Sequence, residues 1–326
     1  MRVFKRLITA AAVLAVLSAP VLVYVNAQAL SDWWRLRNYS PPAGVASLAA
    51  QDTMTASARH IFYVNHPDLE SNANQFRTDC NESEKTIILG CYRSNQDGIF
   101  VYNVQDPRLA GIQQVTAAHE MLHAAYDRLS SHDKDYVDGL LQDYYNTGLH
   151  DQRIIDTVNS YRQTEPNDIV NEMHSIFGTE VASLPAPLEA YYARYFTNRQ
   201  TVIGYAAGYQ TEFTSREDRI KADDARLAQL KSDINSEEQS LQAQLDRINS
   251  DRAGLDSLRG SGSIAAYNSS VESFNSEVET YNLGVNRLKN DISTYNQLVA
   301  ARNAIAVDLN SLSQAIDTRL VPQSAQ

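Results

Sequence analysis

Hydrophobic positions change their spacing several times along the chain. Residues 7–25 form an uncharged apolar run, and three short stretches at 60–65, 85–92 and 98–104 are rich in Ile, Val, Tyr and Phe. Each short stretch is bounded by turn residues, which is typical of β-strands. From about residue 111 apolar residues recur at helical spacing. The pattern predicts an α+β fold in which a short antiparallel sheet precedes a series of helices.

Beyond residue 209 the apolar spacing becomes that of a coiled coil. From Phe213 to Leu255 an apolar residue recurs every seven positions, and from Ile264 to Val299 spacings of three and four alternate. A glycine-rich break at 259–263 separates the two series. We therefore predict a long antiparallel α-helical coiled-coil hairpin over 209–320, with arms 209–258 and 264–317 and a tail 321–326. A coiled-coil partner, self-association and a purely rigid role are all compatible with it.

The N-terminal segment, residues 1–29, is typical of a targeting element. Arg2 and two further basic residues precede the apolar run, and Trp33 and Trp34 follow it, as at a membrane interface. A retained single membrane anchor is the favoured interpretation, and cleavage near Ala29 followed by secretion is the alternative. Residues 30–58, which contain the sequence SPPAG at 40–44, are expected to form a juxtamembrane linker.

Charge and cysteine content narrow the class of protein. The net charge is −11 and basic residues do not cluster, so nucleic acid is not an expected partner. The two cysteines, Cys80 and Cys91, would lie outside the cytoplasm if the N-terminus is exported, where a disulfide closing a small loop is expected. Two reduced cysteines that never meet remain the alternative.

The sequence HEMLH at 119–123 carries the clearest chemistry. His119 and His123 are one helical turn apart, so both imidazoles point to one side and can bind one zinc ion, Zn2+. Glu120 is rotated by about 100° and can act on water instead, as catalytic general base. The competing interpretation is an amphipathic helix with two ordinary histidines.

A third zinc ligand is expected on a second helix at 165–178, with Pro166 in its first turn and Gly178 as its stop. Glu172 lies on the apolar face of this helix, where an unpaired carboxylate would be unfavourable. We predict that Glu172 binds the metal, and an ion pair with a buried arginine is the alternative.

These residues resemble the gluzincins, HExxH metallopeptidases of the thermolysin and CAAX-prenyl-protease type, on the motif HEMLH and the following NEMHS at 171–175. The resemblance implies a small zincin-like catalytic domain at 59–208, zinc as cofactor, and a substrate backbone that pairs with the strand at 98–104. The family often has an acidic residue where this chain has Ile176. A carboxylate that orients a zinc histidine would therefore come from Asp127 or Glu180.

Two further residues are candidates for stabilising the transition state, Tyr161 and His174, although His174 also fits a surface position. The leading functional hypothesis is an exported, membrane-tethered zinc endopeptidase that hydrolyses proteins or peptides with a water activated by Glu120. The alternatives are a partner-binding envelope protein with a non-catalytic zinc site, and a zinc hydrolase of peptidoglycan peptides.

Overall fold

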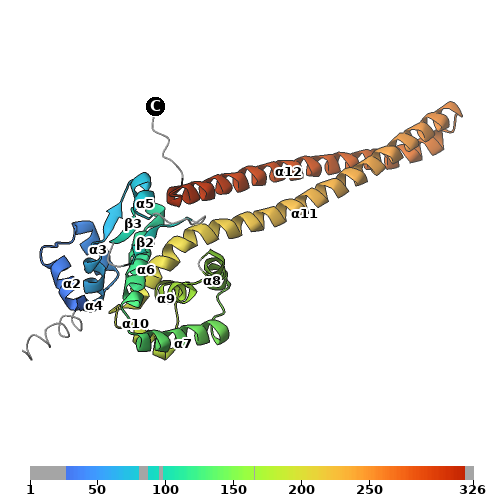
Figure 1. Cartoon of the computed structure of the whole chain (residues 1–326). Coiled ribbons are helices and arrows are strands. Elements are labelled where there is room, and N and C mark those ends of the chain that lie inside the picture. The colour runs from blue at the N-terminus through green and yellow to red at the C-terminus, as the bar shows by residue number, and fades with distance from the viewer. Residues whose placement is uncertain (1–26, 81–86, 95–97, 165, 320–326) are drawn as a thin grey trace, which may run out of the picture. The chain divides into compact units, whose positions relative to one another are not determined.

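The computed structural model describes residues 27–80, 87–94, 98–164 and 166–319 (Figure 1). The chain divides into two compact units. Unit 1 is Met1–Thr211 with Gln314–Gln326, and unit 2 is Glu212–Ser313. The hairpin is thus an insertion whose two ends both return to unit 1. The described residues are mostly helical with one small sheet, so the predicted fold class is confirmed.

The described part of unit 1 begins with three helices: α2 (Ala27–Leu36), α3 (Ala43–Gln51) and α4 (Ala56–Val64). The expected linker at 30–58 thus contains helical structure, and Val45 and Leu48 of α3 are part of the core. The strand predicted at 60–65 is wrong, because these residues lie in and just after α4. The hydroxyl of Thr55 accepts a hydrogen bond from the Ala58 amide and so starts the helix, a local signal that outweighs the apolar run.

The sheet has three strands: β1 (Asp68–Glu70), β2 (Gly90–Arg93) and β3 (Gly98–Tyr102). Their order is β1-β3-β2, with β1 parallel and β2 antiparallel to β3. The sheet is therefore mixed and not antiparallel as predicted, and its first strand follows α4 instead of being formed by 60–65. In the register, Leu69 faces Val101 and Cys91 faces Phe100. Strand β2 is left at an edge.

The remaining elements of unit 1 before the hairpin are α5 (Ala73–Asp79), the 3-10 helix η1 (Pro107–Leu109), α6 (Ile112–Asp127), α7 (Ser131–Thr147), α8 (Gln152–Thr164), α9 (Ile169–Glu180) and α10 (Ala186–Tyr192). Helix α9 packs closely on α6. Gly178 does not stop α9 as predicted but lies inside it, two residues before its end. A Cβ at Gly178 would come within 2.4 Å of Leu122 and 2.8 Å of Tyr192. Glycine at this position allows α9 to approach α6.

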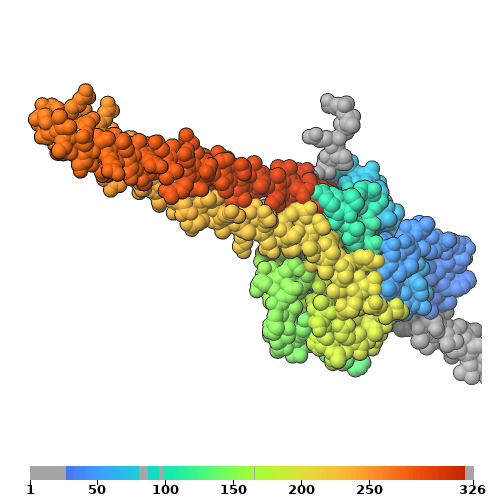
Figure 2. All heavy atoms as spheres, turned by 180° about the vertical axis from the view of Figure 1, so that it is seen from behind, coloured from blue at the N-terminus to red at the C-terminus, as the bar shows by residue number. Residues whose placement is uncertain are grey.

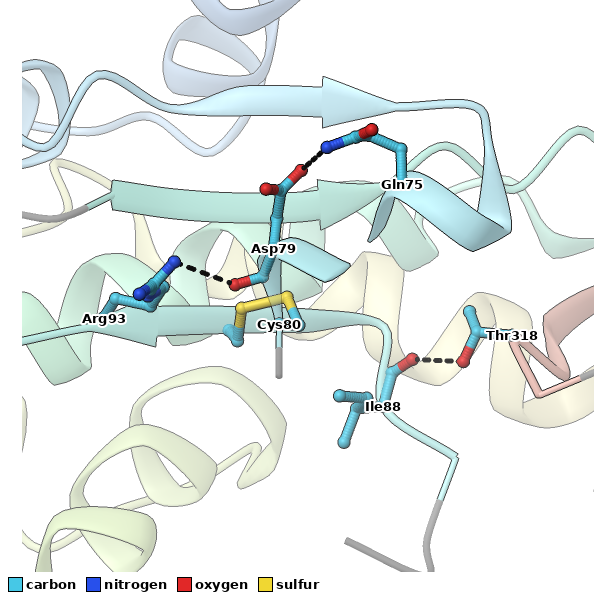
Figure 3. Close-up of a disulfide and its surroundings, with 7 residues drawn as sticks. Gln75, Asp79, Cys80, Ile88, Arg93 and Thr318 are labelled. Carbon is cyan, nitrogen blue, oxygen red and sulfur yellow. Dashed lines mark hydrogen bonds between the residues drawn. A yellow bond between two sulfur atoms is a disulfide. The ribbon is translucent and has the colours of Figure 1, made fainter. Parts of the chain in front are cut away.

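The predicted disulfide between Cys80 and Cys91 is present, and both residues are buried (Figure 3). It joins the end of α5 to edge strand β2. Arg93 also donates to the Asp79 carbonyl at 3.4 Å. Just before the start of the strand, the Thr318 hydroxyl donates to the Ile88 carbonyl at 3.2 Å, which ties the returning C-terminal segment to the approach to β2.

Two long helices, α11 (Arg199–Gly260) and α12 (Ile264–Ile316), contain the arms of the hairpin, joined by a turn with Gly262 at φ +78°. Figures 1 and 2 show them side by side. The predicted seam is largely buried or half-buried, but Ile264 and Ile292 are exposed. Helix α11 begins ten residues before the predicted arm, because its first part, including Val202 and Ala206, belongs to the core of unit 1.

Ion pairs join the two arms of the hairpin. They are Arg216 with Asp308 at 2.6 Å, Arg302 with Asp224 at 2.8 Å and Arg287 with Glu237 at 3.1 Å. Exposed pairs of this kind stabilise a fold only weakly.

Candidate metal centre

The packing of α9 on α6 brings three potential metal ligands together. The Nε2 atoms of His119 and His123 lie 3.0 Å apart. Glu172 reaches both, with Oε1 at 3.4 Å from His123 Nε2 and Oε2 at 3.7 Å from His119 Nε2. One donor atom of each residue lies within 4.8 Å of the others. The three residues predicted as metal ligands are therefore grouped as the sequence indicated.

The separations in this triad suit a tetrahedral ion. Zinc bonds of about 2.0–2.1 Å at tetrahedral angles place neighbouring donors about 3.3–3.4 Å apart. The observed distances of 3.0, 3.4 and 3.7 Å bracket that value. Two imidazoles and one carboxylate are also a common ligand set for catalytic zinc. These three residues fit a zinc ion.

The buried carboxylate of Glu172 makes a cation at this site favourable. Glu172 is 4% exposed, and its Oε2 atom has no hydrogen-bond partner in the described part of the chain. Burial alone would raise the pKa of Glu172, but the two nearby histidines lower it overall. Burial likewise opposes charge on His119, yet Glu172 and Glu120 raise its pKa to about 9. The cluster thus attracts positive charge, which a metal ion supplies.

Glu120 lies beside the triad without belonging to it. It is 5% exposed and lines the same cavity of about 100 Å³ as the two histidines. Strand β2 passes directly over it. A Cβ at Gly90 would lie 2.7 Å from Glu120 Oε1 and 2.4 Å from Thr116 Cγ2, so only glycine leaves room for the carboxylate. This glycine lies within an apolar stretch, where it can indicate a close approach of the backbone.

The strand nearest the cavity is β2, not the one predicted. The stretch 98–104 contains β3, which is paired on both sides and cannot receive another strand. Ile88, Gly90, Cys91 and Tyr92 line the cavity. Among the described strands, the one whose free edge lies at the cavity is β2, and an extended peptide could pair there.

The two carboxylates predicted to orient a zinc histidine have other partners. Asp127 is exposed at the end of α6 and accepts a hydrogen bond from the Tyr92 hydroxyl at 3.1 Å. Glu180 pairs with Arg153 at 2.6 Å and accepts from Gln210 at 2.9 Å. Among the described residues, the hydrogen bonds of these two carboxylates do not reach a histidine of the triad.

The two transition-state candidates separate clearly. Tyr161 of α8 lines the cavity. His174 is fully buried on another side of α9, where its Nε2 shares a hydrogen bond of 2.9 Å with the Tyr191 hydroxyl. Burial lowers the pKa of His174 to about 3, so the ring is neutral. His174 is thus neither a surface residue nor a cavity residue, in agreement with its position about 200° from Glu172.

Two residues at the start of α9 line the cavity although the sequence did not predict them as site residues. Asp168 and Asn171 line the cavity, and the Asn171 amide donates to Asp168 at 3.0 Å. Burial raises the pKa of Asp168, while His123 acts in the opposite direction. Asn171 Oδ1 is buried without a partner among the described residues. With Glu172 these residues have the spacing i, i+3, i+4, so the shared face was visible in the sequence.

Comparison with known proteins gave no match to a family model, a curated protein or a solved structure. The resemblance to gluzincins therefore rests on the motif and on the geometry of the triad.

Proposed function

We propose that unit 1 is a zinc-dependent endopeptidase that acts on proteins or peptides. The observation that carries the proposal is that His119, His123 and Glu172 converge in one cavity with Glu120 beside them. A structural zinc site is normally closed by four protein ligands, whereas three ligands facing a cavity leave room for water and substrate. The described residues offer three.

The roles of the residues follow from their positions. The two imidazoles and the Glu172 carboxylate would hold the ion. When bound, zinc would act as a Lewis acid that polarises a carbonyl group and lowers the pKa of water. Glu120 is placed to accept the proton of the attacking water and to return it to the leaving amine. Its burial against Gly90 keeps the carboxylate in one orientation.

The substrate backbone would lie along β2. Its edge and the cavity are continuous through Gly90, so a peptide paired there would pass over Glu120. Asn171 Oδ1 offers an unused acceptor for a backbone N–H of the same substrate. Tyr161 is the side chain that we assign to stabilising the oxyanion.

Metal content and hydrolysis measured together test the proposal. The wild-type protein is expected to hold about one zinc per chain and to cleave casein. Glu120→Gln should keep the zinc and lose activity by about 10²–10⁴-fold. His123→Ala should lose the metal, whereas His132→Ala, at an exposed position of α7, should keep it.

A clear negative result is available for each part. Full activity of Glu120→Gln would refute the mechanism, and zinc bound without any hydrolysis would indicate a non-catalytic site in an envelope protein. Cleavage of purified sacculi but not casein would redirect the proposal to peptidoglycan peptides.

We also propose that the protein acts outside the cytoplasm, tethered to a membrane. The disulfide Cys80–Cys91 supports this location, since such bonds are typical of exported proteins. No described helix is long and apolar enough to cross a membrane, and the predicted anchor at 7–25 lies outside the described residues. A partner helix or a second copy bound to the hairpin stays a prediction.

A further inference from the structure

Helix α2 exposes an apolar face. Leu30, Trp33 and Trp34 are 49%, 63% and 60% exposed, and their spacing of three and four places them on one side of the helix. Single exposed apolar residues are ordinary, but two tryptophans and a leucine together form a patch that a partner normally covers. We call these three residues the tryptophan face.

Hydrogen bonds on the opposite side of α2 fix the orientation of the tryptophan face relative to the rest of unit 1. Asp32 is 5% exposed and accepts hydrogen bonds from His60 of α4, at 2.9 Å, and from Arg128. Arg128 directly follows α6, the helix with the HExxH motif. Arg35 adds a bond of 2.6 Å to the Val64 carbonyl. Figure 1 shows α2 next to α4 within unit 1. The tryptophan face is therefore held outward by the folded unit.

The surroundings of the face are cationic. Arg37 stacks on the Trp34 ring with its guanidinium 3.4 Å from the ring centre, and Arg59 is exposed on α4. The single acid of α2, Asp32, is buried and paired. A groove of about 400 Å³ runs beside the face, lined by Ala29, Asp32, Trp33, Leu36, Arg37 and His60. This local character contrasts with the chain's net charge of −11.

We propose that the tryptophan face docks on an anionic phospholipid bilayer. Tryptophan is enriched at the headgroup level of membranes, and arginines beside it attract anionic lipids. In the sequence, Leu30 follows the run 7–25, which is apolar and uncharged, by five residues. Docking then holds the end of α6 near the lipid surface. If the proposed peptidase function holds, its substrates are peptide segments near a membrane, but the docking itself does not depend on catalysis.

The chain has two tryptophans, and both are in this face, so fluorescence excited selectively from tryptophan, and not from the 18 tyrosines, reports on this face alone. The full-length protein would be reconstituted into vesicles of phosphatidylethanolamine and phosphatidylglycerol. We expect emission at shorter wavelength than in the unfolded chain, protection from acrylamide, and strong quenching by lipids brominated near the glycerol end of the acyl chain. Tryptophans open to acrylamide in the presence of vesicles would overturn the proposal. Protection without quenching by brominated lipids would also overturn it, because protein would then cover the face.

Charge variants give a matched control. Leu30→Asp keeps both tryptophans but places a charge within the face, and it should abolish quenching by the brominated lipids. Tyr136→Asp, at a position 52% exposed on α7, should leave the quenching unchanged. Arg37→Glu should weaken the quenching in anionic vesicles more than in neutral ones. If Leu30→Asp misfolds by circular dichroism, Arg37→Glu alone decides, and unchanged quenching in that variant overturns the role of charge.

Discussion

Gly90→Ala tests how closely strand β2 controls the general base. The added Cβ would lie 2.4 Å from Thr116 Cγ2, 2.7 Å from Glu120 Oε1 and 2.9 Å from Glu120 Cγ. Ordinary contacts of a Cβ begin near 3.4 Å. Strand and helix would therefore have to separate, or the Glu120 side chain would have to turn, by about 1 Å.

The expected effect on catalysis is larger than the effect on stability. A displacement of about 1 Å in a reacting group can lower the rate by about 10²-fold. Overpacking at a tight contact costs about 1–3 kcal/mol of unfolding free energy. The metal ligands are not the atoms that the Cβ meets, so the zinc content should stay near one per chain.

The assay measures kcat/KM on a fluorogenic peptide together with bound zinc and the denaturant midpoint. Gly139→Ala is the matched control, because a Cβ there meets nothing within 4 Å. In Gly90→Ala with Thr116→Ser, the contact with Cγ2 is removed and the one with Glu120 remains. Stability should recover in this double variant while activity stays low. Activity that recovers with stability would refute the positioning of Glu120 by Gly90.

Three further predictions concern stability and the metal. Asp52 is fully buried, and its carboxylate lacks a partner among the described residues, so burial raises its pKa. The protonated side chain therefore contributes its full stability below about pH 4, and this stability is lost as the pH rises through the raised pKa of Asp52 in the folded protein. Asp52→Asn should therefore stabilise the protein by about 1–3 kcal/mol at pH 7 and by less near pH 4, measured by urea unfolding, and an unchanged difference between the two pH values would contradict this. Replacement of Cys80 and Cys91 by serine should cost about 2–4 kcal/mol, and the wild type should show the same loss in reductant during thermal unfolding. Gly178→Ala should push α9 from α6 and weaken zinc binding in chelator competition, whereas equal zinc affinity would argue against that packing as the support of the site.

The grouping of the three potential metal ligands was predictable because helical spacing fixes the direction of side chains. His119 and His123 share a face of α6 whatever the rest of the fold does, and Glu172 lies on the side of α9 that packs against it. The hairpin was equally readable from its seven-residue repeat. Helical spacing and the seven-residue repeat both depend on residues close in sequence, so both can be recognised from the sequence alone.

Features set by contacts between distant segments were not predictable. A short apolar run is compatible with helix or strand, and at 60–65 the cap at Thr55 decided for α4. Gly178 has the sequence appearance of a helix end, but its role depends on Leu122 and a ring of α10. The contact between Thr318 and Ile88 joins residues 230 positions apart, and the hydrophobic periodicity of the sequence does not predict such a contact.

Anomalous X-ray scattering at the zinc edge from crystals of the full-length protein tests the central claim most directly. We predict one peak per chain within about 2.0–2.2 Å of His119 Nε2, His123 Nε2 and a Glu172 oxygen. Glu172→Ala should remove or strongly weaken this peak. Absence of a peak in zinc-supplemented wild-type crystals, or a peak at other residues, would contradict the account.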